Sequence, residues 1–268
     1  MYLTQRRYIQ DLLNLKFKMD NTKPTGTSLE MNHKLSVYEG EKIEDIKEYQ
    51  SLVGSLIYAT HTRADISYSV GVLSQFMHLP RRPHMDAVKR VLKYLKGTIN
   101  EGIFYTYSSD FDIQIYSDAD WIGAKDDKKS TSGYLAFAGS KLVSWSSKKQ
   151  LIVALSSTQD EYRGLTTSTQ EAIWLKALYT DLGLLSFKPH IFGDSVSSMH
   201  LAANPIFHAR TKHIEVHYHF IREKLMAKEI DISFIPTEKQ VADMMTKALD
   251  GVKLCRFKAM SGIQPIRE

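Results

Sequence analysis

Two aspartates stand at the end of the alternating stretch "FDIQIYSDAD" near the middle of the chain. The alternation predicts a strand in which Ile113 and Ile115 share one face, while Asp118 and Asp120 share the other. Carboxylates grouped at a strand end are suitable ligands for a hard divalent cation. A polar strand end that leads into a turn has the same composition, so the other acids of the chain must decide between the two interpretations.

Three further acids occupy comparable positions. Glu161 falls in the first turn of a long helix predicted over 158–182, Asp194 closes the predicted strand "PHIFGD", and Asp243 lies on a predicted helix "EKQVADMMTKAL". The carboxyl ends of neighbouring parallel strands meet at one rim of a sheet, and a helix over that rim adds its own side chains. Four carboxylates there repel one another unless cations neutralise them. With Asp118, these acids therefore predict a metal site.

Composition limits the class of protein. The chain has 268 residues, 43% hydrophobic and 24% charged, which is enough for a packed core in one large or two small domains. A formal charge of +5 permits a polyanionic partner. The single cysteine, Cys255, excludes an internal disulfide and a cysteine-rich zinc site. Because no apolar run approaches the roughly 18 residues of a membrane span, we expect an intracellular protein with no membrane partner.

The chain divides into segments of different pattern. We predict a short helix over 1–20, a polar linker over 21–48, a helical segment over 49–98, an alternating β and α domain over 103–249, and a C-terminal tail over 250–268. The order strand, strand, strand, helix, strand, helices, strand, helix predicts an α/β fold with a mixed five-stranded sheet and flanking helices. On the long helix, the residues predicted to point inward are Leu165, Ile173 or Ala172, Leu175, Leu178 and Leu182.

Basic side chains gather in two places. The helix predicted around "PHMDAVKRVLKYLKG" carries Lys89, Arg90 and Lys93 on its outer face, together with Lys96. That face is either a solvated surface or a surface that lies along a phosphate backbone.

The second basic segment is "NPIFHARTKHIEVHYHFIRE". Its histidines His213, His217 and His219 lack the cysteine or carboxylate spacing of a zinc site. Arg210, Lys212 and His213 are instead predicted to form a basic loop and helix start that contact nucleic-acid phosphates.

The motifs "YSDADWIG", "LSSTQDEYRG", "DSVSSMHLAANPIFHARTKHIEVHYHFIRE" and "VADMMTKAL" together resemble the ribonuclease H domain at the C-terminal end of copia-type retrotransposon Pol polyproteins. "LTQRRYIQDLL", "YQSLVGSLIYATHTRADISYSV" and "HMDAVKRVLKYLKGT" are similar to the end of the reverse transcriptase in the same polyproteins. The resemblance runs from about Tyr2 to Leu249. It implies a ribonuclease H-like sheet preceded by a helical segment from the end of the reverse transcriptase.

The resemblance also implies an activity. The four catalytic acids of the family fall on Asp118, Glu161, Asp194 and Asp243, which would hold two Mg²⁺ ions, with Mn²⁺ as a substitute. Asp118 would be shared by both ions, Glu161 and Asp194 would hold the ion near the leaving group, and Asp243 would hold the ion that activates water. The implied reaction is hydrolysis of the RNA strand of RNA/DNA hybrids. The implied partners are the hybrid and the polymerase portion, in a cytoplasmic virus-like particle or in the nucleus.

Each acid also has a structural alternative. Glu161 completes a capping box with Thr158 if it binds no metal, and Asp194 caps the helix that follows it. Asp243 taken alone is an ordinary helix-surface acid, and Asp120 either supports the metal ligands or forms a turn. These alternatives remain open at the level of sequence.

Some features depart from the family or are missing. Gln159 and Asp160 stand where many relatives have Glu-Ala, and Ala64 stands where Pro is common. The paired aspartates of a polymerase site are not matched, because Asp126-Asp127 lies in a lysine-rich hairpin that we interpret as a solvated turn. The chain is therefore expected to have no polymerase site. It is either an active ribonuclease H or a remnant, weak or inactive in catalysis, that at most binds nucleic acid.

Overall fold

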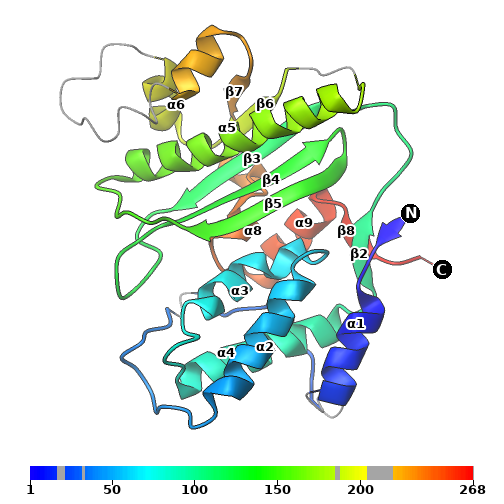
Figure 1. Ribbon diagram of the computed structural model, residues 1–268, viewed down its shortest axis with the longest axis vertical. Coiled ribbons are helices and arrows are strands. Elements are labelled where there is room, and N and C mark those ends of the chain that lie inside the picture. Colours follow the sequence, from blue (N-terminus) through cyan, green and yellow to red (C-terminus); the bar gives the residue numbers. More distant parts are fainter. Residues whose placement is uncertain (17–21, 32–33, 185–187, 204–219, 268) are drawn as a thin grey trace. The chain divides into compact units, whose positions relative to one another are not determined.

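The computed structural model describes residues 1–16, 22–31, 34–184, 188–203 and 220–267 (Figure 1). The chain folds into two compact units. We call them the helical unit, which comprises 1–106, 124–128 and 247–268, and the sheet unit, which comprises 107–123 and 129–246. The helical unit is therefore assembled from both ends of the sequence.

The sheet unit contains a five-stranded mixed sheet of order β5-β4-β3-β6-β7 (Figure 1). The first three strands are antiparallel neighbours, whereas β3 pairs with β6, and β6 with β7, in parallel. The elements are β3 (Ile113–Asp120), β4 (Thr131–Ala138), β5 (Lys141–Lys149), α5 (Ser157–Asp181), β6 (His190–Gly193), α6 (Val196–Ala203), β7 (Asp231–Phe234), η3 (Thr237–Lys239) and α8 (Asp243–Thr246). The predicted α/β fold class with a mixed five-stranded sheet is confirmed.

The core of the sheet unit lies between α5 and one face of the sheet, and Figure 1 shows α5 running across the strands. Ile113 and Ile115 of β3 pair with Ala138 and Ala136 of β4, so that apolar side chains of the two strands stand side by side. The buried residues of α5 against them include Tyr162, Leu165, Ala172, Leu175 and Tyr179. Each large apolar side chain buried in this way contributes about 1.5–3 kcal/mol relative to an exposed one.

The two ends of α5 correct two details of the sequence prediction. The helix is capped by Ser156, whose side chain accepts a hydrogen bond from the amide of Gln159 at 3.2 Å. At the other end Leu178 and Leu182 are 36% and 64% exposed, so the prediction that they point inward was wrong. The buried stripe steps by three residues from Ala172 to Leu175 and by four from Leu175 to Tyr179, and the second step leaves Leu178 outside it.

The helical unit contains mainly short elements. They are β1 (Tyr2–Leu3), α1 (Arg6–Asp11), η1 (Leu12–Lys16), α2 (Ile46–Ala59), η2 (Ala64–Ile66), α3 (Ser67–Ser74), α4 (Arg82–Gly97), β2 (Glu101–Phe104), α9 (Gly251–Met260) and β8 (Ile263–Pro265). The segment predicted as one helix over 1–20 begins instead with a two-residue strand and two short helical turns. In α4, the buried residues Val88, Val91, Leu92 and Leu95 have helical spacing, as its sequence pattern predicts.

Residues 250–268, predicted as a tail, contain the helix α9 and the strand β8. Asp250 caps α9 by accepting from the amide of Lys253 at 2.8 Å. β8 pairs with β2, and β2 pairs with β1, in an antiparallel sheet of order β1-β2-β8. This small sheet joins the first strand of the chain to the last one described, with β2 between them (Figure 1).

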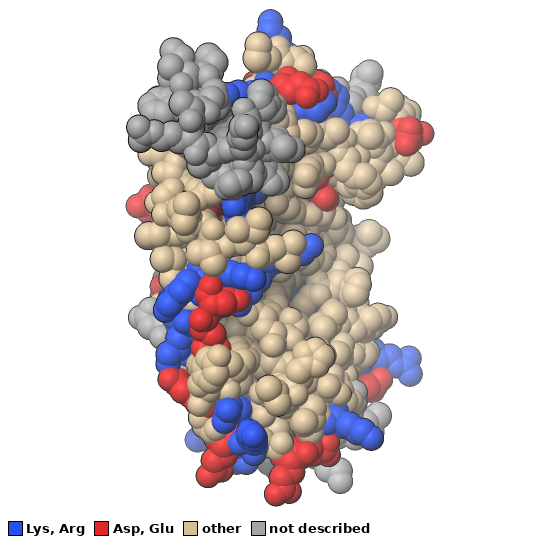
Figure 2. Space-filling model, turned by 60° about the vertical axis from the view of Figure 1, so that its left-hand side comes forward, with Lys and Arg blue, Asp and Glu red and all other residues tan. Residues whose placement is uncertain are grey.

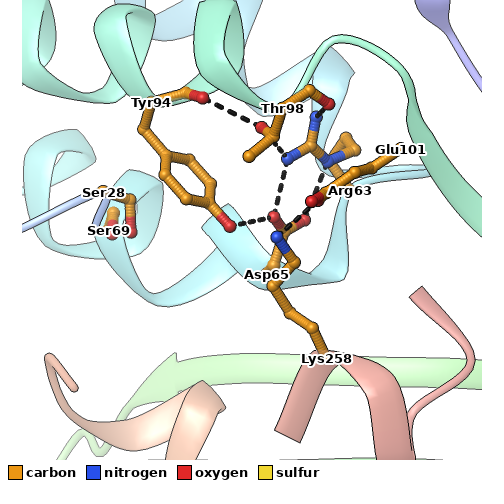
Figure 3. Close-up of polar contacts among 8 residues, drawn as sticks. All are labelled: Ser28, Arg63, Asp65, Ser69, Tyr94, Thr98, Glu101 and Lys258. Atoms are coloured by element: carbon orange, nitrogen blue, oxygen red, sulfur yellow. Dashed lines mark hydrogen bonds and ion pairs between the residues drawn. The ribbon is translucent and has the colours of Figure 1, made fainter. Parts of the chain in front are cut away.

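A buried ion pair joins the elements of the helical unit (Figure 3). Arg63 donates to Asp65 through Nε at 2.9 Å and Nη2 at 2.7 Å, and both side chains are almost fully buried. Arg63 also donates to the carbonyl of Thr98 at 3.1 Å, and Tyr94 donates to Asp65 at 2.6 Å. Burial alone would raise the pKa of Asp65, but the charge and hydrogen bonds of Arg63 outweigh burial and lower it to about 2.

Lys258 of α9 adds a second cation to this cluster. It forms an ion pair with Glu101 of β2 and lies over the ring of Tyr94, with its Nζ 5.3 Å from the ring centroid. Its charge also lowers the pKa of Asp65, after the larger effects of burial and Arg63. The helix α9 is thereby held in the helical unit by charge as well as by the burial of Leu254 and Phe257.

The turn between β3 and β4 corrects the interpretation of Asp126. The carboxylate of Asp126 accepts from the hydroxyl of Ser36 at 2.6 Å and from the amide of Val37 at 2.9 Å. Lys125 forms an ion pair with Glu39. The turn is therefore fixed to the connector that precedes α2 and is not simply solvated, because each carboxylate oxygen of Asp126 has a donor there.

We expect the substitution Asp65→Asn to destabilise the helical unit strongly. The asparagine removes the charge that compensates Arg63, and an uncompensated buried charge costs about 3–5 kcal/mol. Denaturant unfolding monitored by circular dichroism measures the decrease in the free energy of unfolding.

The matched control is Glu30→Gln. Glu30 also pairs with an arginine, Arg90 at 2.7 Å, but its side chain is 60% exposed. An exposed pair contributes at most about 1 kcal/mol, so this variant should unfold close to wild type. Equal decreases for the two substitutions would contradict the role assigned to the buried pair.

Candidate metal centre

The parallel pairing of β3 with β6 brings two predicted acids to one rim of the sheet. Tyr116 is the register partner of Phe192, so Asp118 and Asp194, two residues further along each strand direction, reach the same level. Asp118 lies within the last residues of β3 and is buried, and Asp194 directly follows β6 and is half-buried. The ends of β3 and β6 therefore meet at one rim of the sheet, as the sequence predicted for Asp118 and Asp194.

The third acid comes from α8. Asp243 is the first residue of this short helix and is fully buried, so the alternative of an ordinary surface acid does not apply. α8 approaches the sheet closely at Gly133 of β4, where an added Cβ would collide with Met245. The segment before α8 is fixed by Gln240, whose side-chain amide donates to the carbonyl of Ser117 at 2.8 Å. The chain thus holds Asp243 beside the end of β3.

Asp118, Asp194 and Asp243 form one cluster in which each contributes an oxygen within 4.8 Å of the others. Two threonines donate to these carboxylates: Thr246 to Oδ2 of Asp118, and Thr237 to Oδ2 of Asp194 at 2.9 Å. These two acids are therefore each held in one orientation. Three carboxylates around a common point provide the hard, anionic oxygen ligands that Mg²⁺ and Mn²⁺ prefer, so the donor set fits a divalent cation.

Glu161, the fourth predicted acid, lies in the first turns of α5 and is half-buried. It does not belong to the cluster defined by the 4.8 Å spacing. The N-cap of α5 is Ser156 and not Thr158. The structural alternative for Glu161, a capping box with Thr158, is therefore not formed. The structural alternative for Asp194 was to cap α6. The side chain that caps α6 is instead that of Ser195, whose hydroxyl accepts from the amide of Ser198 at 3.3 Å.

Asp160, beside Glu161, has an unusual environment. Its side chain is buried, and this burial, with the nearby charge of Asp120, raises its pKa to about 6 despite hydrogen bonding and the charge of Arg163. The side chain of Gln150 donates to Oδ1 of Asp160 at 2.5 Å. Asp160 faces this amide and is not one of the three clustered carboxylates. Asp120, at the end of β3, also lies outside that set and is half-buried.

The predicted nucleic-acid residues occupy different surroundings. On α4, Lys89 is exposed and Lys93 is half-buried, whereas Arg90 is held by Glu30 at 2.7 Å and by the hydroxyl of Thr27 at 3.0 Å. Arg210, Lys212 and His213 lie outside the described residues. On the face shown in Figure 2, Lys and Arg side chains alternate with Asp and Glu and do not gather into one basic field.

Sequence reasoning missed the threonines of this site. Thr246 follows Asp243 by three residues, a spacing that places both on the same side of a helix, and this was the available signal. Thr237 has no comparable signal, because its contact with Asp194 joins residues far apart in the sequence.

The strand order, the parallel β3–β6 register and the three acids at the rim define the sheet unit as ribonuclease H-like. The relatives of the chain specify this class further. It is 45% identical to the retrovirus-related Pol polyprotein from transposon RE1 of Arabidopsis thaliana, over 98% of this chain and 18% of that protein. It is 39% identical to the Pol polyprotein from transposon TNT 1-94 of Nicotiana tabacum, over 98% of this chain and 20% of that protein. The chain belongs to the copia-type retrotransposon Pol polyproteins.

The chain spans only about a fifth of these polyproteins. A shorter relative, the uncharacterized mitochondrial protein AtMg00810 of Arabidopsis thaliana, is 39% identical over 66% of this chain and 73% of that protein. No family model matches the sequence. None of the described helices is long and apolar enough to cross a membrane.

Solved structures of low sequence identity resemble parts of the chain. The N-terminal ribonuclease H domain of rv2228c from Mycobacterium tuberculosis is 13% identical, with a TM-score of 0.38 over 56% of this chain and 97% of that chain. The foamy viral protease-reverse transcriptase in complex with an RNA/DNA hybrid is 12% identical, with a TM-score of 0.45 over 75% of this chain and 26% of that chain.

We expect Mn²⁺ to stabilise the sheet unit through the three clustered carboxylates. A cation that binds only the folded state at a concentration of 100 times its Kd adds about 2.7 kcal/mol to the free energy of unfolding. Thermal unfolding with and without Mn²⁺ should therefore show a rise in Tm that is largely abolished in Asp118→Asn. The asparagine keeps an oxygen that can accept from Thr246.

The control for this measurement is Asp112→Asn, which removes the same charge from an exposed position before β3. It should keep the wild-type rise in Tm. An equal rise in Asp118→Asn and Asp112→Asn would mean that the cation binds elsewhere.

Proposed function

We propose that the sheet unit is a metal-dependent endonuclease that hydrolyses the RNA strand of RNA/DNA hybrids within a retrotransposon Pol polyprotein. The observation that carries the proposal is the cluster of Asp118, Asp194 and Asp243, whose oxygens lie within 4.8 Å of one another. Membership of the copia-type Pol family supports the substrate class, because a retrovirus-related element copies RNA into DNA and thereby makes hybrids. The polymerase portion of the polyprotein is the expected partner.

The proposed residue roles follow from where each acid is held. Asp118 lies on β3, the central strand of the sheet, and its carboxylate is grouped with both Asp194 and Asp243, so it would be the ligand common to two ions. Asp194 would hold the ion on the leaving-group side, and Asp243 the ion on the water side. Bound Mg²⁺ ions supply charge neutralisation and Lewis acidity to a phosphodiester. The chain contributes the orientation of the ligands through the hydroxyls of Thr246 and Thr237.

Glu161 completes the proposed ligand set on the leaving-group side. Its helix packs on the face of the sheet opposite to the side chain of Asp118, and Gly164 allows close approach, since a Cβ there would stand 3.4 Å from the carbonyl of Asp118. The proposal requires the side chain of Glu161, in the first turns of α5, to extend around the end of β3 to this rim. Its assignment is more dependent on the family than those of the three clustered aspartates.

Cleavage of an end-labelled RNA/DNA hybrid by the purified chain tests the proposal. In Mg²⁺ or Mn²⁺ we expect cuts in the RNA strand only, and a decrease of about 100-fold or more in rate for Asp118→Asn, because one ligand common to both ions is removed. The affinity for the hybrid in metal-free buffer should stay close to wild type.

Asp112→Asn is the charge-matched control and should cut at the wild-type rate. Hydrolysis by Asp118→Asn at the wild-type rate would reject the metal-site assignment. If the folded wild-type chain binds Mn²⁺ but cuts no hybrid, the alternative of a non-catalytic remnant becomes the better description.

The basic face of α4 carries a separate prediction about binding. We propose that Lys89 and Lys93 contact phosphates, so Lys89→Ala with Lys93→Ala should weaken hybrid binding and reduce the salt slope of log K by about 1 for each lysine replaced. Fluorescence anisotropy at several salt concentrations measures both quantities. Lys47→Ala, an exposed lysine of α2, is the control. If the salt slope of log K does not change in the double variant, the basic face of α4 is a solvated surface that does not contact phosphates.

A further inference from the structure

A cavity lies in the sheet unit, and none of the three clustered acids lines it. It is a cavity of about 310 Å³ between α5, β4 and the end of β5. This volume is at the lower end of the range for small-molecule sites, roughly 300–1,000 Å³. Its walls are formed by Ser132, Gly133, Tyr134, Ser146, Lys148, Lys149, Gln150, Leu151, Ile152, Arg163, Gly164, Thr166, Thr167 and Gln170.

The cavity and the acid cluster use opposite faces of the sheet. Ser132 pairs with Ala119 of β3, and Lys148 pairs with Ser132, so these side chains stand on the face that α5 covers. Asp118, adjacent to Ala119 on the same strand, points to the other face because side chains alternate along a strand. The cavity is therefore not an extension of the metal centre.

The chemistry of the walls favours an anion. Two cationic side chains face the cavity, Lys148 of β5 and Arg163 of α5. Lys149 also belongs to the lining, but alternation along β5 turns its side chain to the other face of the sheet. The described lining includes no carboxylate.

Ser132 of β4 and Ser146 of β5 add neutral hydroxyl donors to the lining. Thr166 and Thr167 also line the cavity, but their hydroxyls donate to the carbonyls of Tyr162 and Arg163 within α5. Cations combined with hydroxyl donors are the groups that bind phosphate oxygens in proteins.

Part of this wall is fixed in place. Arg163 donates through Nη1 to the carbonyl of Ile152 at 3.1 Å, which holds the guanidinium against the β5–α5 connection. Gln150 donates to the hydroxyl of Ser132 at 2.8 Å and to Oδ1 of Asp160 at 2.5 Å. The acid Asp160 thus lies behind this amide and does not line the cavity. A guanidinium held in advance loses less conformational freedom when a ligand binds.

The rim of the cavity is apolar. Leu151 and Ile152 are 84% and 63% exposed, and both line its mouth. A free inorganic ion makes no apolar contact with such a rim, whereas the sugar or ring that carries a phosphate can pack against it.

We propose that this cavity binds a phosphate group carried on an organic ligand, with Lys148 and Arg163 as its principal cations. The phosphate belongs either to the backbone of a nucleic-acid strand or to a small phosphorylated molecule. The site is independent of the proposed hydrolysis, since its residues lie outside the acid cluster.

Isothermal titration calorimetry with inorganic pyrophosphate in metal-free buffer containing a chelator tests the site. The absence of divalent cations leaves the acid cluster without attraction for anions. We expect binding by the wild-type chain, and affinity at least about tenfold weaker in Arg163→Gln and in Lys148→Gln, because each substitution removes one charge-assisted interaction. Amide NMR signals of Thr166 and Thr167 should shift during the titration.

The matched control is Lys176→Gln, which removes the same charge from α5 at a position outside the cavity lining. It should bind pyrophosphate like wild type. No binding by the wild-type chain, or equal affinity in all three variants, would overturn the proposal.

Competition with a short oligo(dT) strand separates the two sources of phosphate. Displacement of pyrophosphate by the strand identifies a backbone phosphate, and its persistence identifies a small phosphorylated ligand. Hybrid cleavage by Arg163→Gln in Mg²⁺ is read separately, so failure of the phosphate site and failure of the proposed nuclease remain distinguishable.

Discussion

Mutual repulsion among carboxylates is the constraint around which the sheet unit is organised. The register of β3 with β6 fixes Asp118 and Asp194 at one level, and α8 adds Asp243 to the same place. Like charges in a partly desolvated site raise the free energy of the folded state. The unit tolerates this cost because the apolar core on the opposite face and the contacts of Gln240 and Thr246 hold the strands and α8 in position. Such an arrangement is suited to binding cations.

The predictable part of the site came from patterns local to one element. Alternation in "FDIQIYSDAD" placed Asp118 on a strand face, and the pattern "PHIFGD" placed Asp194 at the end of a second strand. A parallel arrangement of these strands predicted that the two acids meet at one rim. Asp243 was placed on a helix predicted over "EKQVADMMTKAL", of which only the four residues of α8 are α-helical. Its role as a ligand depended on the family resemblance, because a single acid on a helix has no distinguishing pattern. Glu161 was placed on the correct helix, but the residue that caps this helix, Ser156, was not identified.

The unpredicted features depend on partners far away in the sequence. Nothing local in "TRADI" reveals that Arg63 and Asp65 are buried together, because the burial is completed by Tyr94 of α4 and by the region of Lys258. Asp126 was interpreted as solvated because its partner, Ser36, is 90 residues away. No strand was predicted in the tail over 250–268 for the same reason, since β8 is a strand only through its pairing with β2. Periodicity within a window cannot detect pairing of this kind.

The pairing of β8 with β2 has a consequence for the order in which the chain acquires structure during synthesis. Ile103 and Ile263 are register partners, so the helical unit contains a contact between residues 160 positions apart. On the ribosome, every residue of the sheet unit emerges before Ile263 does. The five-stranded sheet can therefore form first. At that stage β2 still lacks its pairing with β8, and Glu101 and the buried pair of Arg63 and Asp65 still lack the charge of Lys258 on α9. Long-range contacts of this kind slow folding, and the helical unit, although it contains the beginning of the chain, is the last to be completed.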